Sequence, residues 1–243
     1  MSDWRELVAE AAALDPKHVR FGSARHRYTM APPITDAAVL AALPEDLRAY
    51  ADVSGGGVGP YYGLLALDKV TPIAAPAGIS AWTRALPIAH LGCGYAALYV
   101  LDGPRGQIWI DARAIGVVAK MHASFADYML DWLGRITQGR WLESFVPPGQ
   151  CALAGALSGF LGFHERQLGI PEGTLAGAEL TAALNLLGPG AIALAAESPL
   201  PLFAAGDPVD PCVTCARLVE NLVGQGLRPD VLVPGRVPIP DRA

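Results

Sequence analysis

The sequence predicts a fold of the α+β class, in which helices and β-strands are formed by different stretches of the chain. Residues 95–101 and 107–111 are two apolar runs separated by a turn sequence, which predicts a β-hairpin. Other stretches, such as residues 3–14 and 125–133, repeat apolar side chains at the spacing of a helix. Helical patterns dominate after residue 150, so a helix-rich α/β region is expected there.

The chain begins with three predicted helices. The first covers residues 3–14 and ends where Asp15 precedes Pro16, because a residue before proline avoids the helical conformation. The second covers residues 35–43, with Thr35 as the expected N-cap. The third covers residues 44–50 and opens on a proline, which is tolerated in a first helical turn.

A glycine-rich stretch follows at residues 55–60. It lacks the Gly-Lys-Ser/Thr ending of a phosphate-binding loop, so we interpret it as a turn that uses positive φ angles. Residues 61–67 are apolar and aromatic, which predicts a strand.

The second half of the chain differs in composition. Residues 150–243 contain no lysine, and their nine acidic residues outnumber five arginines. The Pro-Pro-Gly sequence at 147–149 predicts a boundary between a domain at 1–146 and another at 150–243. The elements predicted beyond it are helices at 151–168, 179–187 and 212–224, a strand at 191–196 and an extended tail at 234–243.

Charge and hydropathy exclude some classes of function. The formal net charge is −5 and no run of Lys or Arg occurs, which argues against binding to nucleic acid. A membrane-spanning helix needs about 20 apolar residues. The two most apolar stretches, 144–163 and 180–196, are both interrupted by proline. The N-terminus does not resemble a signal peptide, so a cytoplasmic protein without membrane contact is expected.

Several short motifs occur in an order that is typical of one family. They are Arg25-His26-Arg27-Tyr28, Pro32-Pro33-Ile34-Thr35, Leu43-Pro44-Glu45-Asp46-Leu47-Arg48, the glycine-rich stretch with Tyr61-Tyr62-Gly63-Leu64, Gly92-Cys93-Gly94-Tyr95, Asp102-Gly103-Pro104, Gln107-Ile108-Trp109-Ile110-Asp111, and Ser124-Phe125 with Trp132-Leu133. Residues 1–145 thereby resemble the bacterial branch of the Smi/Knr family in the SUKH superfamily. One departure is the short spacing between Thr35 and Pro44, since family members usually carry one or two more helical turns there.

The resemblance implies a mixed, mainly antiparallel sheet flanked by helices. It also implies a non-enzymatic role, because bacterial relatives resemble immunity proteins that bind and neutralise toxins. Eukaryotic relatives resemble regulatory scaffolds of cell-wall synthesis. The expected partner is therefore a protein, with a toxin as the leading candidate and a scaffold role as an alternative.

Catalytic motifs are scarce. None of the five histidines lies three or four residues from another histidine, so no helical pair of histidine ligands is predicted. Cys212 and Cys215 have ligand-like spacing at an expected helix N-terminus, where thiol pKa values fall. A redox or metal-dependent role of this pair is the alternative function, although no second ligand pair accompanies it. No cofactor is expected, and Cys93 is interpreted as a small buried hydrophobe.

A partner-binding surface is the remaining prediction. Aromatic and arginine side chains dominate binding energies at protein interfaces. We expect the loop at 55–62 and the neighbouring hairpin to form the exposed rim of such a surface. The candidate residues are Tyr61, Tyr62, Asp102, Arg105, Trp109, Asp111 and Arg113. Trp109 alternates with two isoleucines, so it should lie on the opposite side of the sheet from them.

Overall fold

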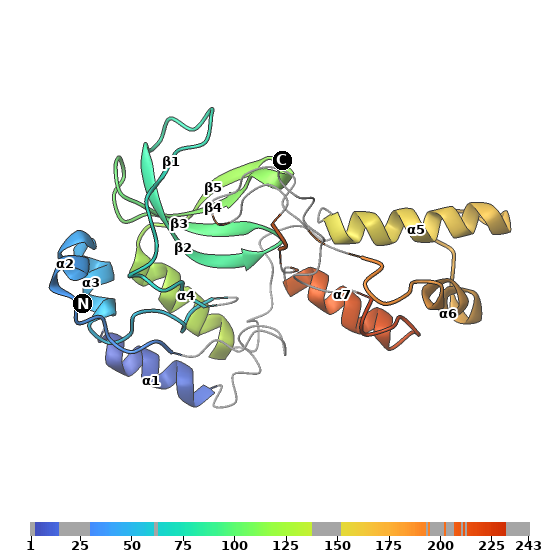
Figure 1. Ribbon diagram of the computed structural model, residues 1–243, viewed down its shortest axis with the longest axis horizontal. Coiled ribbons are helices and arrows are strands. Elements are labelled where there is room, and N and C mark those ends of the chain that lie inside the picture. Colours follow the sequence, from blue (N-terminus) through green and yellow to red (C-terminus); the bar gives the residue numbers. More distant parts are fainter. Residues whose placement is uncertain are drawn as a thin grey trace, which may run out of the picture. The chain divides into compact units, whose positions relative to one another are not determined.

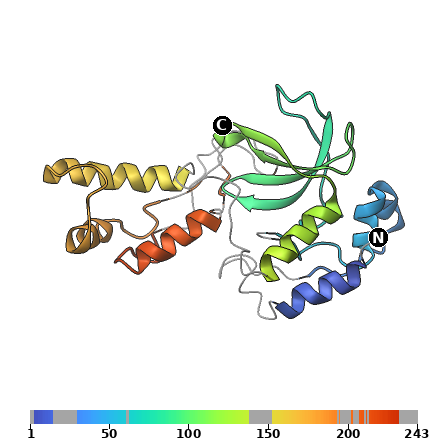
Figure 2. The same cartoon turned by 180° about the vertical axis from the view of Figure 1, so that it is seen from behind.

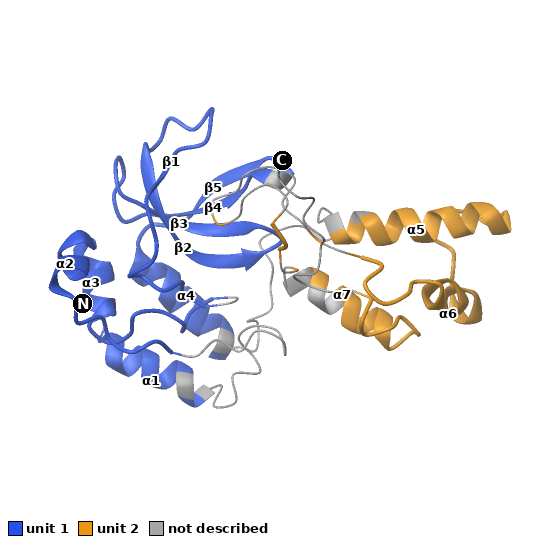
Figure 3. Ribbon diagram, viewed as in Figure 1, with its two compact units in different colours: residues 1–143 blue, residues 144–243 orange. Residues whose placement is uncertain are grey.

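The computed structural model describes residues 3–14, 30–60, 63–137, 152–192, 194, 202, 207–209, 211 and 213–231. The chain forms two compact units, Met1–Glu143 and Ser144–Ala243 (Figure 3). The division lies just before the Pro-Pro-Gly sequence at 147–149.

The first unit contains a five-stranded sheet, which confirms the α+β class (Figure 1). The strands are β1 (Ile73–Ala74), β2 (Arg84–Gly92), β3 (Tyr95–Val100), β4 (Ile108–Ala112) and β5 (Val117–His122). Their spatial order repeats their order in the chain, and every neighbouring pair is antiparallel. The sheet is therefore an antiparallel meander.

Two hairpins form the centre of the sheet. The predicted hairpin is β3–β4, with Tyr99 opposite Ile108. The β2–β3 turn places Cys93 at φ +52° and Gly94 at φ +77°, the combination that a type I′ turn requires. Cys93 is half-buried at this turn, so its interpretation as a buried hydrophobe is wrong.

The segment at 61–67 does not form the predicted strand in its described part. Leu64 makes one isolated antiparallel bridge to Ala89, and the Leu65 N–H donates to the Ile88 carbonyl at 2.8 Å. No further ladder pair joins the described part of this segment to β2.

Four helices belong to the first unit: α1 (Trp4–Leu14), α2 (Ala37–Ala42), α3 (Glu45–Ala51) and α4 (Phe125–Thr137). Their positions confirm the predicted helices. The N-cap of α2 is Asp36, not Thr35, because the Asp36 carboxylate accepts from the N–H groups of Ala38 and Val39 at 2.8 and 3.2 Å.

The core of the first unit lies between the sheet and these helices. In both views α4 lies between the sheet and α1 (Figures 1 and 2). Three aromatic rings join the helices, since Trp4 of α1 lies 5.6 Å from Tyr50 of α3 and 5.3 Å from Phe125 of α4, centroid to centroid. Burial of such rings supplies a large share of the hydrophobic stabilisation.

The glycine-rich stretch lies inside the fold. Gly55 donates to the Pro32 carbonyl at 2.9 Å, and Gly57 donates to the Leu64 carbonyl at 2.7 Å. The stretch is thus held by backbone hydrogen bonds to the segment at Pro32 on one side and to the segment at Leu64 on the other. Positive φ angles at Gly56 and Gly59 confirm the predicted turn, but its burial shows that the described part is not an exposed rim.

The second unit contains α5 (Ala152–Leu168), α6 (Gly177–Asn185) and α7 (Val213–Val223). The predicted strand at 191–196 is limited in the described chain to single backbone hydrogen bonds, such as the one from Ile192 to Val231 at 3.1 Å. The tail at 234–243 lies outside the described residues. None of the described helices combines the length and the apolar character needed to cross a membrane.

A carboxylate fixes the loop that follows α5. Glu165 is 3% exposed and accepts from the N–H groups of Gly173 and Leu175 at 2.9 and 2.8 Å. These backbone hydrogen bonds, first the one from Leu175, lower the pKa of Glu165 below its ordinary value.

We expect this carboxylate to make the loop sensitive to acid. A lowered folded pKa gives stability that is present above the ordinary glutamate pKa and is lost as the pH falls through the folded pKa. The protection of the Gly173 and Leu175 amides, measured as exchange relative to the intrinsic rate at each pH, should therefore decrease at acidic pH in the wild type. In Glu165→Gln this protection should already be low at neutral pH and should no longer depend on pH. Equal exchange in both proteins at neutral pH would contradict the assignment.

Candidate functional site

The structure separates the predicted partner-binding residues into two groups. Asp102 and Arg105 lie in the turn between β3 and β4. Trp109 and Asp111 lie along β4, and Arg113 begins the short 3-10 helix η1 (Arg113–Ile115) that follows it. Tyr61 and Tyr62 lie outside the described residues.

Trp109 faces away from the side of the sheet that the helices cover. Ile108 and Ile110 are buried at 0 and 6% exposure, whereas Trp109 is half-buried, which confirms the predicted alternation. The Trp109 Nε1 donates to the Gln107 side-chain oxygen at 3.2 Å, and its ring contacts Trp82 edge-on at 6.2 Å between centroids.

Lys120 of β5 is the cross-strand neighbour of Trp109. Opposite residues of an antiparallel pair project to the same side of a sheet. The exposed Lys120 side chain and the half-buried indole therefore lie next to each other. Val118, half-buried, occupies the next position on this side and is opposite Asp111.

Asp111 is a correction to the predicted rim. It is 1% exposed, and its carboxylate accepts from the Arg113 backbone N–H at 3.2 Å and from Arg113 Nε at 3.0 Å. A further short ion pair joins Arg113 Nη2 to the second carboxylate oxygen. The hydrogen bond to Asp111 raises the pKa of Arg113. Asp111 thus fixes Arg113, whose side chain is 32% exposed and reaches the surface in its place.

The turn between β3 and β4 carries an exposed ion pair. Arg84 Nε lies 2.5 Å from Asp102 Oδ2, and the two side chains are 59 and 40% exposed. The hydrogen bond from Arg84 lowers the pKa of Asp102 and raises that of Arg84. Water screens such a pair, so it orients the turn more than it stabilises the fold.

A buried tyrosine at the end of β3, next to this turn, makes a hydrogen bond to α3. The Tyr99 hydroxyl donates to Asp46 Oδ1 at 2.6 Å. Burial and this hydrogen bond raise the pKa of Tyr99, while the charge of the exposed Arg105 acts in the opposite direction. The turn is thus held from its inner side, and Arg105 is presented to solvent.

The sequence did not predict a cluster of three titratable side chains, from His122, Asp131 and Arg135, between β5 and α4. His122 Nε2 lies 3.6 Å from Asp131 Oδ2, and Asp131 also accepts from Arg135 Nε at 2.9 Å. Burial lowers the pKa of His122, with the Asp131 charge acting against it. The signal available was the Val-Val-Ala-Lys-Met-His run itself, which has the β-branched start of a strand.

Of the two cysteines in the predicted redox or metal pair, the structure describes Cys215. Cys215 is buried in α7, and Cys212 lies outside the described residues. Within the ranges that the structure describes, no three His, Cys, Asp or Glu side chains converge as metal ligands. No observation on this part of the chain favours the redox or metal alternative.

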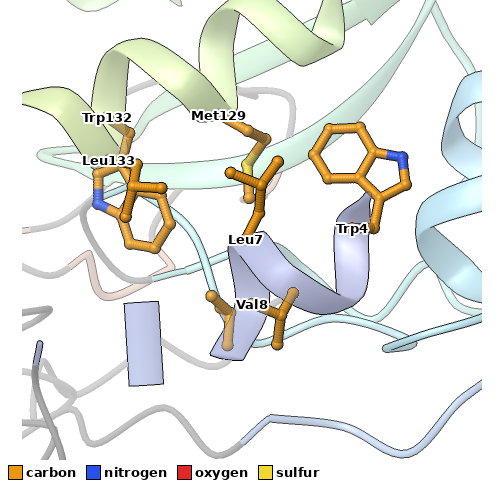
Figure 4. Close-up of a pocket in the computed structure, with 7 residues that line it drawn as sticks. Trp4, Leu7, Val8, Met129, Trp132 and Leu133 are labelled. Atoms are coloured by element: carbon orange, nitrogen blue, oxygen red, sulfur yellow. The ribbon is translucent and has the colours of Figure 1, made fainter. Parts of the chain in front are cut away.

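An apolar hollow lies between α1 and α4 (Figure 4). Its lining residues are Trp4, Leu7, Val8, Val58, Met129, Trp132 and Leu133. Its cavity volume is about 10 Å³, far below the roughly 300–1,000 Å³ of small-molecule sites. We interpret it as a packing imperfection of the core.

The side of the sheet formed by Trp109, Arg113, Val118 and Lys120 is therefore the candidate site, and we name it the β4–β5 surface. It places an aromatic ring of β4 beside the Lys120 cation of β5, and the Arg113 cation follows at the end of β4. Comparison with known proteins adds nothing to this geometry, because no family model, curated protein or solved structure matches the chain.

Proposed function

We propose that this protein is a non-enzymatic binding module of the bacterial immunity or antitoxin type, which acts in the cytoplasm by occluding a toxin. Two lines of reasoning support the proposal. One is the resemblance of residues 1–145 to the Smi/Knr family. The other is the β4–β5 surface.

The observation that carries the proposal is the pairing of Trp109 with Lys120 on neighbouring strands of the sheet. Tryptophan and arginine are enriched among the residues that dominate interface energies. The Gln107 hydrogen bond holds the indole, and Asp111 holds Arg113. Side chains that are already ordered lose less entropy on binding, so this surface suits a tight protein contact.

Co-expression with the toxin encoded by the neighbouring gene tests the function. We expect the wild-type chain to restore growth and to form a complex with the toxin on gel filtration. Truncation of two central contacts in Trp109→Ala/Lys120→Ala should weaken the complex by roughly 1,000-fold, since interface hot spots are each worth about 2 kcal/mol.

Lys69→Ala is the matched control, because Lys69 is also an exposed lysine of the first unit but lies outside the β4–β5 surface. It should leave growth and complex formation unchanged. A wild-type chain that neither restores growth nor forms a complex would reject the toxin-binding function.

A further inference from the structure

β5 is one of the two outer strands of the sheet, and no other strand in the described part of the chain pairs with its outer edge. Val117 is 38% exposed, and Ala119 and Lys120 are also exposed. An open strand edge presents unpaired backbone groups that can pair with another chain. The hydrogen-bond pattern of the ladder determines which of these groups point outward.

The turn between β3 and β4 sets the phase of that ladder. Gly106 has a positive φ of +86° and donates to the Val100 carbonyl, while Val100 donates to Gln107 at 2.9 Å. This is the pattern of a glycine bulge, in which two residues oppose one. Val100 thus bonds toward β4.

Hydrogen-bonded and non-bonded pairs alternate along an antiparallel ladder. Counting from Val100, the pair Leu98–Trp109 is hydrogen-bonded, so the backbone groups of Ile110 point toward β5. Ile110 is opposite Ala119. The groups of Ala119 therefore bond inward, and those of Val118 and Lys120 point outward.

No hydrogen bond joins these outward groups to any other residue in the described part of the chain. Lys120 likewise makes no ion pair with a described carboxylate. The backbone groups of Val118 and Lys120 thus form a short row of hydrogen-bond donors and acceptors, and the Lys120 side chain adds a positive charge to it.

We propose that β5 receives an extended segment of a partner protein as a sixth, antiparallel strand, with a carboxylate of that segment opposite Lys120. The proposal rests on the protein-binding function and identifies how the partner is held. Main-chain hydrogen bonds give affinity in this mode, and the side chains on either side of the strand give specificity.

The two sides of β5 define the partner's sequence pattern. Lys120 lies on the side of Trp109, where an acidic residue of the added strand would form a cross-strand ion pair. Ala119 and the exposed Val117 lie on the opposite side, where apolar residues of the added strand would cover them. The preferred segment therefore alternates apolar residues with polar ones, one of which is acidic.

A second copy of this chain fits the edge less well. Outward residues must pair with outward residues, so a two-fold pairing centred on Lys120 places two lysines opposite each other. Centring it on Ala119 leaves the lysines as diagonal neighbours, which repel. Centring it on Val118 overlaps only three residues of each strand. Lys120 thus opposes self-association, as edge lysines do.

Amide exchange on the isotope-labelled full chain tests the proposal. The probe is the blocked peptide Thr-Val-Thr-Val-Glu-Val-Thr-Val-Thr, and its twin has Lys in place of Glu. At millimolar concentration the Glu peptide should slow exchange of the Val118 and Lys120 amides, whereas the Ala119 amide should be protected without peptide. A cross-strand ion pair is worth up to about 1 kcal/mol, so the twin should bind up to roughly five-fold more weakly.

Two proline variants are matched. Lys120→Pro removes an outward N–H and should abolish the peptide response with unfolding stability nearly unchanged. Ala119→Pro removes an inward N–H, so it should destabilise the sheet. Lys120→Glu should reverse the preference between the peptides. No response to either peptide, equal responses to both, or protection that depends on protein concentration alone would overturn the proposal.

The growth assay separates this inference from the proposed function. If wild type restores growth and Lys120→Pro restores it equally, the strand-addition mode is wrong and the toxin-binding function stands. If wild type fails to restore growth while the peptide response is present, the function is wrong and the edge still binds extended segments.

Discussion

Gly56→Ala is expected to lower the free energy of unfolding of the first unit strongly. A Cβ at residue 56 would lie 2.6 Å from the Leu65 carbonyl oxygen and 3.1 Å from the Ala66 Cα. Both neighbours are backbone atoms, so no side chain can rotate away. The φ of +147° also disfavours an L side chain. We expect a loss of roughly 3 kcal/mol in the free energy of unfolding.

Urea unfolding followed by tryptophan fluorescence measures this loss. All five tryptophans precede residue 144, so the signal reports the first unit alone. Gly116→Ala is the matched control, because its φ is +74° but no atom lies within 4 Å of the added Cβ. It should cost only about 1 kcal/mol. Equal losses in both variants would show that the close backbone approach at Gly56 does not contribute.

Arg113→Met is expected to have the second largest effect. Among the described residues, it leaves the buried Asp111 carboxylate with the backbone N–H of residue 113 as its one remaining partner. Removing one member of a buried ion pair costs 3–5 kcal/mol in general, and the 32% exposure of Arg113 reduces this to roughly 2–3 kcal/mol.

Two further variants test whether the loss comes from the Asp111–Arg113 ion pair. Arg84→Met removes an ion pair that is exposed on both sides, so it should change the free energy of unfolding by less than about 1 kcal/mol. The double variant Asp111→Asn/Arg113→Met should lose less than the sum of its single variants. Additive losses would mean that the two side chains do not stabilise each other.

Much of the fold follows from local pattern. The β3–β4 hairpin and the helices α1, α4 and α5 have strong periodicity and clear turn residues, and the structure places them as predicted. β2 could not be identified in this way. β2 is buried on both sides, so its sequence shows no alternation of apolar and polar residues. Pro87 within it is also unusual for a strand and favours the prediction of a loop.

The candidate site was only partly predictable. Alternation along β4 places Trp109 on the correct side of the sheet, because that depends on the backbone alone. The burial of Asp111 depends on Arg113 folding back over it, which no spacing rule specifies. Lys120 becomes relevant only once β5 is known to pair with β4, a contact between strands that composition does not encode.

The meander has a consequence for the order in which the first unit folds. Each strand pairs with the next one along the chain, so every hairpin closes a short loop at little entropic cost. The ring contact between Trp4 and Phe125 instead joins the two ends of the unit. The helix α1 is synthesised first. We nevertheless expect it to dock among the last elements of the first unit, after the sheet and α4 have formed a surface for it.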